Sequence, residues 1–98
     1  MKTKVVLEAW TDYYMYDDGT NESVAALLAW PAELDLPLLQ PRIDVRLNNK
    51  AYRVANVVVE EDGSQTVTCR QNMGYNRFRE ERLASLKEVG WQLVKEYK

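Results

Sequence analysis

Residues 43–70, with the sequence IDVRLNNKAYRVANVVVEEDGSQTVTCR, carry the clearest structural pattern of the chain. Apolar and polar side chains alternate from Ile43 to Leu47, which is the pattern of a half-buried strand. Two polar turns, Asn48-Asn49-Lys50 and Glu61-Asp62-Gly63-Ser64, separate the apolar runs, and asparagine and Asp-Gly suit tight hairpins. The segment therefore predicts three consecutive antiparallel strands, a β-meander.

The residues before the meander predict a hairpin followed by a rigid connection. Residues 5–16 alternate and are rich in valine and aromatic side chains, which predicts a long first strand, and residues 17–21 form its turn. Ser23–Trp30 suits a returning strand, which we favour, or a helix capped by Asn21 and stopped by Pro31. Three prolines then make a rigid loop with four leucines tucked beneath it: Pro31, Pro37, Pro41, Leu34, Leu36, Leu38 and Leu39.

The residues after the meander predict a loop, a helix and a final strand. Gln71–Asn76 is polar and contains a glycine, so we expect a loop there, with Asn76 capping a helix that starts at Arg77. Leucine and valine at helical spacing give this helix one apolar stripe, and Gly90 is placed to end it. Trp91–Tyr97 suits a last strand, although a helix continuing through Gly90 is the alternative.

Together these segments predict one globular domain over residues 1–98, of the α+β class: a small curved antiparallel β-sheet or a partly closed barrel, with one helix near the C-terminus. Leu36–Arg70 resembles an SH3-like small barrel in its proline-rich entry and its turn at Leu47–Val54. The resemblance implies a barrel-like fold, covers about a third of the chain and contains no motif with chemical content, so it implies no function.

Composition excludes several kinds of chemistry. The 98 residues contain no histidine and a single cysteine, which removes imidazole bases, disulfides and the usual zinc sites. Four glycines are scattered singly, so no phosphate-binding loop is present. Cys69 lies in an alternating segment, where cysteine usually acts as a small buried hydrophobe. We therefore expect no catalytic residue, no metal site and no cofactor, and a protein that is not an enzyme.

Charge is distributed unevenly along the chain. The net charge is −2, but residues 1–40 hold two bases and seven acids, whereas residues 41–98 hold eleven bases and eight acids. Such a dipolar surface can orient a partner. The first apolar run stops at Glu8, too early for a signal peptide, and no segment is long enough to span a membrane. With its lone cysteine, the chain is expected to be cytoplasmic and to have no membrane partner.

Two aromatic-rich groups are the candidate binding residues. The first lies on the first strand and the second surrounds the start of the helix: Trp10, Tyr13, Tyr14 and Tyr16, then Arg70, Tyr75, Arg77, Phe78 and Arg79. Tyrosine and tryptophan are common in interface hot spots, and arginine beside aromatic rings suits phosphate and base contacts. The competing interpretation is that one aromatic set belongs to the core and that Arg79 and Arg82 pair with neighbouring glutamates on a solvated helix face.

Three functions remain open from the sequence. We favour a non-catalytic interaction module that blocks or adapts another macromolecule, most simply another protein, in the style of small inhibitors encoded by phages or mobile elements. The alternative is a protein that binds or sequesters a nucleotide or single-stranded nucleic acid, although a net charge of −2 argues against a general nucleic-acid binder. The third is a small structural or assembly subunit that forms homo-oligomers through exposed strand edges.

Overall fold

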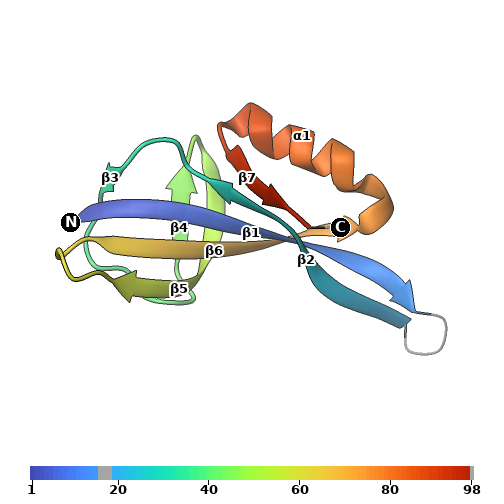
Figure 1. Cartoon of the computed structure of the whole chain (residues 1–98), viewed down its shortest axis with the longest axis horizontal. Coiled ribbons are helices and arrows are strands. Elements are labelled where there is room, and N and C mark those ends of the chain that lie inside the picture. Colours follow the sequence, from blue (N-terminus) through green and yellow to red (C-terminus); the bar gives the residue numbers. More distant parts are fainter. Residues whose placement is uncertain (16–18, 98) are drawn as a thin grey trace.

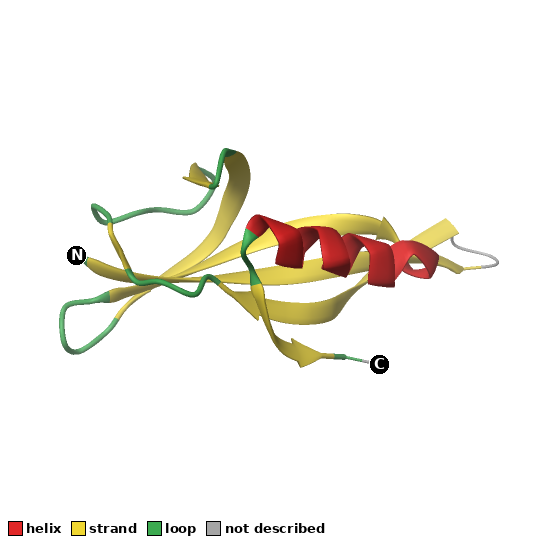
Figure 2. Ribbon diagram, turned by 90° about the horizontal axis from the view of Figure 1, so that it is seen from above, coloured by secondary structure: helices red, strands yellow, loops and turns green. Residues whose placement is uncertain are grey.

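The structure is a computed structural model that describes residues 1–15 and 19–97. Most of these residues lie in strands, with one α-helix near the C-terminus (Figures 1 and 2). In chain order the elements are β1 (Lys2–Met15), β2 (Gly19–Ala29), β3 (Leu34–Asp35), β4 (Asp44–Leu47), β5 (Lys50–Val59), β6 (Gln65–Tyr75), a 3-10 turn (Asn76–Phe78), α1 (Arg79–Val89) and β7 (Gln92–Glu96).

The strands form one sheet with the order β4-β5-β6-β1-β2-β7, and β3 pairs with the start of β1. Neighbours are antiparallel except for β1 and β6, which run parallel with Val5 opposite Val67 and Leu7 opposite Cys69. The sheet is therefore mixed, and the prediction of a purely antiparallel sheet is wrong. The sheet is curved but open, so the SH3-like barrel is not confirmed.

The predicted meander is confirmed as β4, β5 and β6. Its first turn places Asn48 and Asn49 in left-handed backbone conformation, with φ of 51° and 66°, which asparagine tolerates. In β5 the register shifts between Val54 and Asn56. Such an irregularity bends a strand, and Figure 1 shows β5 starting upright beside β4 and then turning to run along β6.

The core lies between the sheet and α1, which crosses one face (Figure 2). Val5, Leu7 and Ala9 of β1 are fully buried on that face, as their alternation predicts. Their even-numbered neighbours lie on the opposite face, which we call the open face. Trp91 anchors the end of the core, since its ring packs edge-on against Trp30 and Tyr52 at centroid distances of 5.2 and 5.1 Å.

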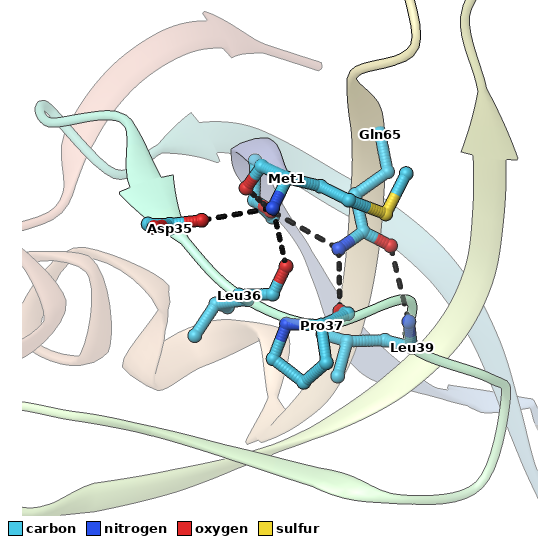
Figure 3. A network of polar contacts seen from close by, with 7 residues as sticks. Met1, Asp35, Leu36, Pro37, Leu39 and Gln65 are labelled. Atoms are coloured by element: carbon cyan, nitrogen blue, oxygen red, sulfur yellow. Dashed lines mark hydrogen bonds and ion pairs between the residues drawn. The ribbon is translucent and has the colours of Figure 1, made fainter.

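A buried glutamine holds the proline-rich loop (Figure 3). Gln65 is fully buried; its Nε2 donates to the carbonyl of Pro37 at 2.8 Å and to Thr3 Oγ1 at 3.0 Å, while its Oε1 accepts from the amide of Leu39 at 3.1 Å. Three of the four loop leucines pack against the core as predicted. Leu38 is 63% exposed, contrary to prediction. Its neighbours Pro37 and Leu39 both hydrogen-bond to Gln65 through their main chains, and the Leu38 side chain points outward.

The two ambiguous segments are strands, as favoured: Ser23–Trp30 falls mostly in β2 and Trp91–Tyr97 mostly in β7. The predicted loop at Gln71–Asn76 is wrong, since β6 continues to Tyr75 because β1 pairs with it. Asn76 does not cap α1; its Oδ1 accepts a hydrogen bond from Thr11 Oγ1 at 3.3 Å instead.

The sequence places glycine in the turn of the first hairpin and at the end of the helix, and the structure describes the second position fully. Residues 17 and 18 of the first hairpin turn lie outside the described residues, and Gly19 already belongs to β2. Gly90 ends α1 as predicted, with φ of 133°. A Cβ at Gly90 would lie only 3.0 Å from the ring of Trp30, so the close approach also requires glycine.

Candidate binding surfaces

Polar side chains and one tryptophan gather on the open face where β6, β1 and β2 lie side by side. We call them the open-face cluster: Glu8, Trp10, Asp12, Glu22, Arg70 and Asn72. The guanidinium carbon of Arg70 lies 3.7 Å from the centroid of the Trp10 ring, and Arg70 Nη2 donates to Glu22 Oε2 at 2.7 Å. Candidate residues from both sequence groups thus meet here.

The remaining contacts of the open-face cluster join all three strands. Asn72 Nδ2 donates to Glu22 Oε1 at 2.7 Å and to Asp12 Oδ1 at 3.0 Å, and Trp10 Nε1 donates to Glu8 at 3.3 Å. The cluster holds three carboxylates and one guanidinium, so it has an excess of negative charge. It therefore acts as a cross-strand lock and is a poor receptor for phosphate.

A second surface lies where β1 leaves the core. We call it the aromatic patch: Tyr13, Tyr75, Arg77 and Phe78. Tyr13 is 36% exposed and Tyr75 is 46% exposed. The guanidinium of Arg77 lies 5.7 Å from the ring centroid of Tyr75 and 4.8 Å from that of Phe78, within the range of cation–π attraction. Here too, one residue of the first sequence group joins three of the second.

The aromatic patch borders a hollow of about 390 Å³. Tyr13, Tyr75 and Arg77 line it together with Asp12 and Asn76. Asp12 and Tyr75 are register partners across β1 and β6, so the two strands hold the walls of the hollow in place. The hollow thus combines exposed rings with one cation and one carboxylate on a fixed backbone.

Arg79 occupies a different environment from Arg77. Its side chain is only 13% exposed, and its Nη2 donates to the carbonyls of Ala25, at 2.8 Å, and of Tyr97. Its Nε donates to Glu96 at 3.2 Å. Arg79 therefore fastens the start of α1 to β2 and to the end of the chain. These contacts leave it little capacity to hold an external phosphate.

The other two tyrosines of the first sequence group provide less information. The main chain of Tyr14 pairs with Thr20, but its side chain lies outside the described part of the structure, and Tyr16 lies outside it entirely. Sequence reasoning also missed a hollow of about 540 Å³ between β5, β6 and α1, in whose lining only Arg70 was a candidate. The signal was weak because its cations are widely separated in sequence.

Cys69 is buried in the core, as its alternating segment predicts. Burial, with a smaller contribution from the negative charge of Asp44, raises the pKa of its thiol to about 11. A thiol with so high a pKa is a poor nucleophile at neutral pH. Within residues 1–15 and 19–97, no group of three or more cysteine or carboxylate side chains is arranged to hold a metal ion.

Comparisons with protein-family models, with curated protein sequences and with solved structures found no match to this chain. In the described part of the chain, no helix combines the length and the apolar character of a membrane-spanning segment.

Proposed function

We propose that this chain is a non-catalytic binding protein that attaches to another protein through the aromatic patch and thereby blocks or adapts that partner. The observation that carries the proposal is the exposure of Tyr13 and Tyr75 beside Arg77, around one hollow. Tyrosine and arginine are over-represented among the residues that dominate protein–protein binding energy.

The way in which the patch is held also favours binding. Tyr13 and Tyr75 come from adjacent paired strands, so their backbones are fixed before a partner arrives. Both rings are partly buried already, which reduces the side-chain entropy lost on association. Arg77 has no ion pair within the described residues, so its charge remains available to a partner carboxylate or carbonyl.

The overall shape places the patch at an accessible position. The molecule measures 46 × 27 × 23 Å, and the hairpin strands β1 and β2 extend beyond α1 and the meander (Figure 1). Tyr13 comes directly after the last pair of β1 with β6, Asp12 with Tyr75, so the aromatic patch lies where β1 and β2 continue without β6. A partner with a recess can therefore accept the hairpin while its rim contacts the patch, an arrangement suited to occluding a site.

The test compares a patch variant with a matched surface variant. Tyr13→Ser with Tyr75→Ser alters the patch, whereas Leu93→Ser with Val94→Ser alters similarly exposed side chains on β7. Each immobilised protein is incubated with extract from the cells that produce the chain, and any protein retained in fixed ratio is purified and its affinity measured. We expect wild type and the β7 variant to bind the same protein, and the patch variant to lose it with an unchanged melting temperature.

Two results would overturn the proposal. Equal affinity of the patch variant and wild type would place the interface elsewhere. A wild-type chain that retains no protein at all would remove the premise of a protein partner. Circular dichroism of each variant confirms that loss of binding does not arise from loss of fold.

Binding of a nucleotide or single-stranded nucleic acid is the second candidate, because Arg77 lies over two aromatic rings. Asp12 in the same hollow weighs against it, since a carboxylate repels phosphate. Fluorescence anisotropy with labelled oligo-dT separates the two candidates. Nucleic-acid binding should weaken steeply with added salt and disappear in Arg77→Glu, whereas an aromatic protein interface is much less sensitive to salt.

Self-assembly is the third candidate, and it rests on β7. Among the residues that the structure describes, this edge strand pairs only with β2 and exposes Leu93 and Val94, so it offers a free edge to a second copy. Sedimentation over a wide concentration range tests it. A monomer at every concentration removes this candidate, and association that Val94→Lys abolishes supports it.

A further inference from the structure

Strands β5 and β6 diverge before β6 ends. Their last pair at this end of β6 is Arg53 with Arg70, after which β6 continues to Tyr75 with β1 along its other side. Lys50–Tyr52, at the start of β5, pair with β4 and have no register partner in β6. Figure 1 shows this half of β5 turned away from β6. Within the described residues, the β6 edge from Gln71 to Tyr75 has no strand beside it.

A hollow of about 540 Å³ occupies the space opened by this divergence. Its lining includes four consecutive residues of β5, Lys50–Arg53, and four of β6, Arg70–Met73. Consecutive side chains of a strand point to opposite faces of the sheet. A cavity that is lined by four consecutive residues of one strand must therefore run along the edge of that strand. Arg82, Ser85 and Val89 of α1 form another wall at helical spacing. We call this hollow the edge slot.

The walls of the edge slot are fixed in place. Asn48 Nδ2, in the β4–β5 turn, donates to the carbonyl of Val89 at the end of α1 at 2.7 Å. Met73 and Leu86 are buried and give the slot an apolar floor. The main-chain donors and acceptors on an unpaired strand edge are the groups to which an added strand binds. Beyond Met73 this edge is interrupted, because Gly74 has a φ of 88° and its amide donates to Asn72 Oδ1 at 2.6 Å. The slot therefore offers the strand edge from Gln71 to Met73, with an apolar surface beside it.

Charge in the edge slot selects the kind of occupant. Four cations line it, against the single carboxylate of Asp44, which Arg53 holds at 2.7 Å. Arg70 is paired with Glu22 outside the slot. Lys50 and Arg82 have no ion-pair partner among the residues described, so two positive charges are left to attract an anionic ligand.

We propose that the edge slot binds an acidic, extended segment of a partner protein, which adds as a strand to the free edge of β6 and places carboxylates against Lys50 and Arg82. A peptide supplies main-chain amides for the strand edge, which a nucleic acid does not. This site is separate from the aromatic patch, and its test does not depend on the function proposed for that patch.

The probe is a fluorescein-labelled eight-residue peptide of alternating glutamate and valine, measured by anisotropy in low salt. Two control peptides isolate the two interactions. Lysine in place of glutamate reverses the charge, and N-methylation of alternate backbone amides removes strand pairing while keeping every carboxylate. Labelled oligo-dT serves as the competing anion. We expect the glutamate peptide alone to bind, with slower hydrogen exchange of amides within residues 71–73.

Charge-reversal variants locate the binding. Lys50→Glu with Arg82→Glu changes the slot, and Arg46→Glu with Lys87→Glu makes the same change of charge at exposed positions outside it. All four residues are exposed, so both variants should fold, which the melting temperature checks. We expect the slot variant to bind the glutamate peptide roughly tenfold or more weakly and the control variant to stay within about twofold of wild type.

Three outcomes would overturn the proposal. Equal binding of the N-methylated peptide or of oligo-dT would show a simple anion site without strand addition. Equal weakening in both charge-reversal variants would show a general effect of net charge. Absence of peptide binding by wild type at millimolar concentration would show that the slot does not accept a strand.

Discussion

Arg77 and Arg79 lie two residues apart, and from the sequence alone both are candidate phosphate ligands. In the structure one of them stabilises the fold and the other is available for binding. Arg79 is nearly buried and holds two main-chain carbonyls, whereas Arg77 is exposed over aromatic rings. Replacing each with alanine should therefore separate stability from binding. Arg79→Ala should destabilise the fold, and Arg77→Ala should leave it nearly unchanged.

The magnitude follows from the contacts that are lost. The carbonyl of Ala25 keeps a second donor, the amide of Tyr97 at 2.8 Å, so its loss is partial. The carbonyl of Tyr97 loses the guanidinium, and a hydrogen bond from a charged donor is worth about 1.5–3 kcal/mol. The partly exposed ion pair with Glu96 adds roughly 0.5 kcal/mol. Arg79→Ala should thus lower the free energy of unfolding by about 2–4 kcal/mol.

Urea unfolding followed by tryptophan fluorescence measures this, since Trp91 is buried in the core. For a domain of this size the loss corresponds to a melting temperature lower by roughly 10–25 °C. Arg77→Ala should cost less than about 1 kcal/mol. Arg79→Lys keeps the charge but not the planar fork, so it should lose much of the same stability. Equal costs for Arg79→Ala and Arg77→Ala would refute the assignment of Arg79 as a structural lock.

Three further predictions concern the core and its boundaries. Gln65→Met should cost about 2–4 kcal/mol because it strips three internal hydrogen bonds from a buried site, whereas Thr66→Ala, which removes one exposed bond on the same strand, should cost under about 1 kcal/mol in the same urea assay. A thiol reagent should label Cys69 only as fast as the protein unfolds, and rapid labelling of the native protein would contradict its burial. Burial raises the pKa of this thiol in the folded protein to about 11 from 9.0, so above pH 9 the unfolded chain loses the thiol proton first. Wild type should therefore lose stability relative to Cys69→Ala as pH rises above 9. Gly90→Ala should lower the melting temperature, because the new methyl group would press on Trp30 in a backbone conformation that alanine disfavours, and an unchanged value would count against this close approach.

Most of the elements that the sequence predicts correctly have partners close along the chain; the strand at Trp91–Tyr97, which pairs with β2, is an exception. Asn48 and Asn49 specify a tight turn, so the pairing of β4 with β5 follows from local chemistry alone. The strand at Ser23–Trp30 follows from the turn that precedes it, against the helix preference of its alanines and leucines. Tertiary pairing overrides helix propensity in that segment, as it often does in short apolar runs.

The features that the sequence misses depend on distant partners. No local pattern indicates that Lys2–Met15 pairs with Gln65–Tyr75 in parallel, and this pairing also turns the predicted loop at Gln71–Asn76 into strand. Nothing in the local sequence distinguishes Arg79 from an exposed helix arginine. Its structural role arises from hydrogen bonds to the carbonyls of Ala25 and Tyr97, which are distant in sequence. The edge slot likewise opens where β5 bends away from β6. The bend coincides with the register shift at Ala55, which no local sequence pattern predicts.

The fold also changes the meaning of the uneven charge along the chain. Glu22, from the acidic part of the sequence, pairs with Arg70 from the basic part at 2.7 Å, so one pair of these opposite charges is neutralised within the open-face cluster. Positive charge remains at Lys50 and Arg82 in the edge slot. Added salt should therefore weaken peptide binding at the slot, because the Debye length falls from about 10 Å at 0.1 M to about 3 Å at 1 M. Binding through the aromatic patch should change far less, since it depends mainly on exposed rings that a partner would bury. If both binding events respond equally to salt in the same titration, the charge-based distinction between the two surfaces is wrong.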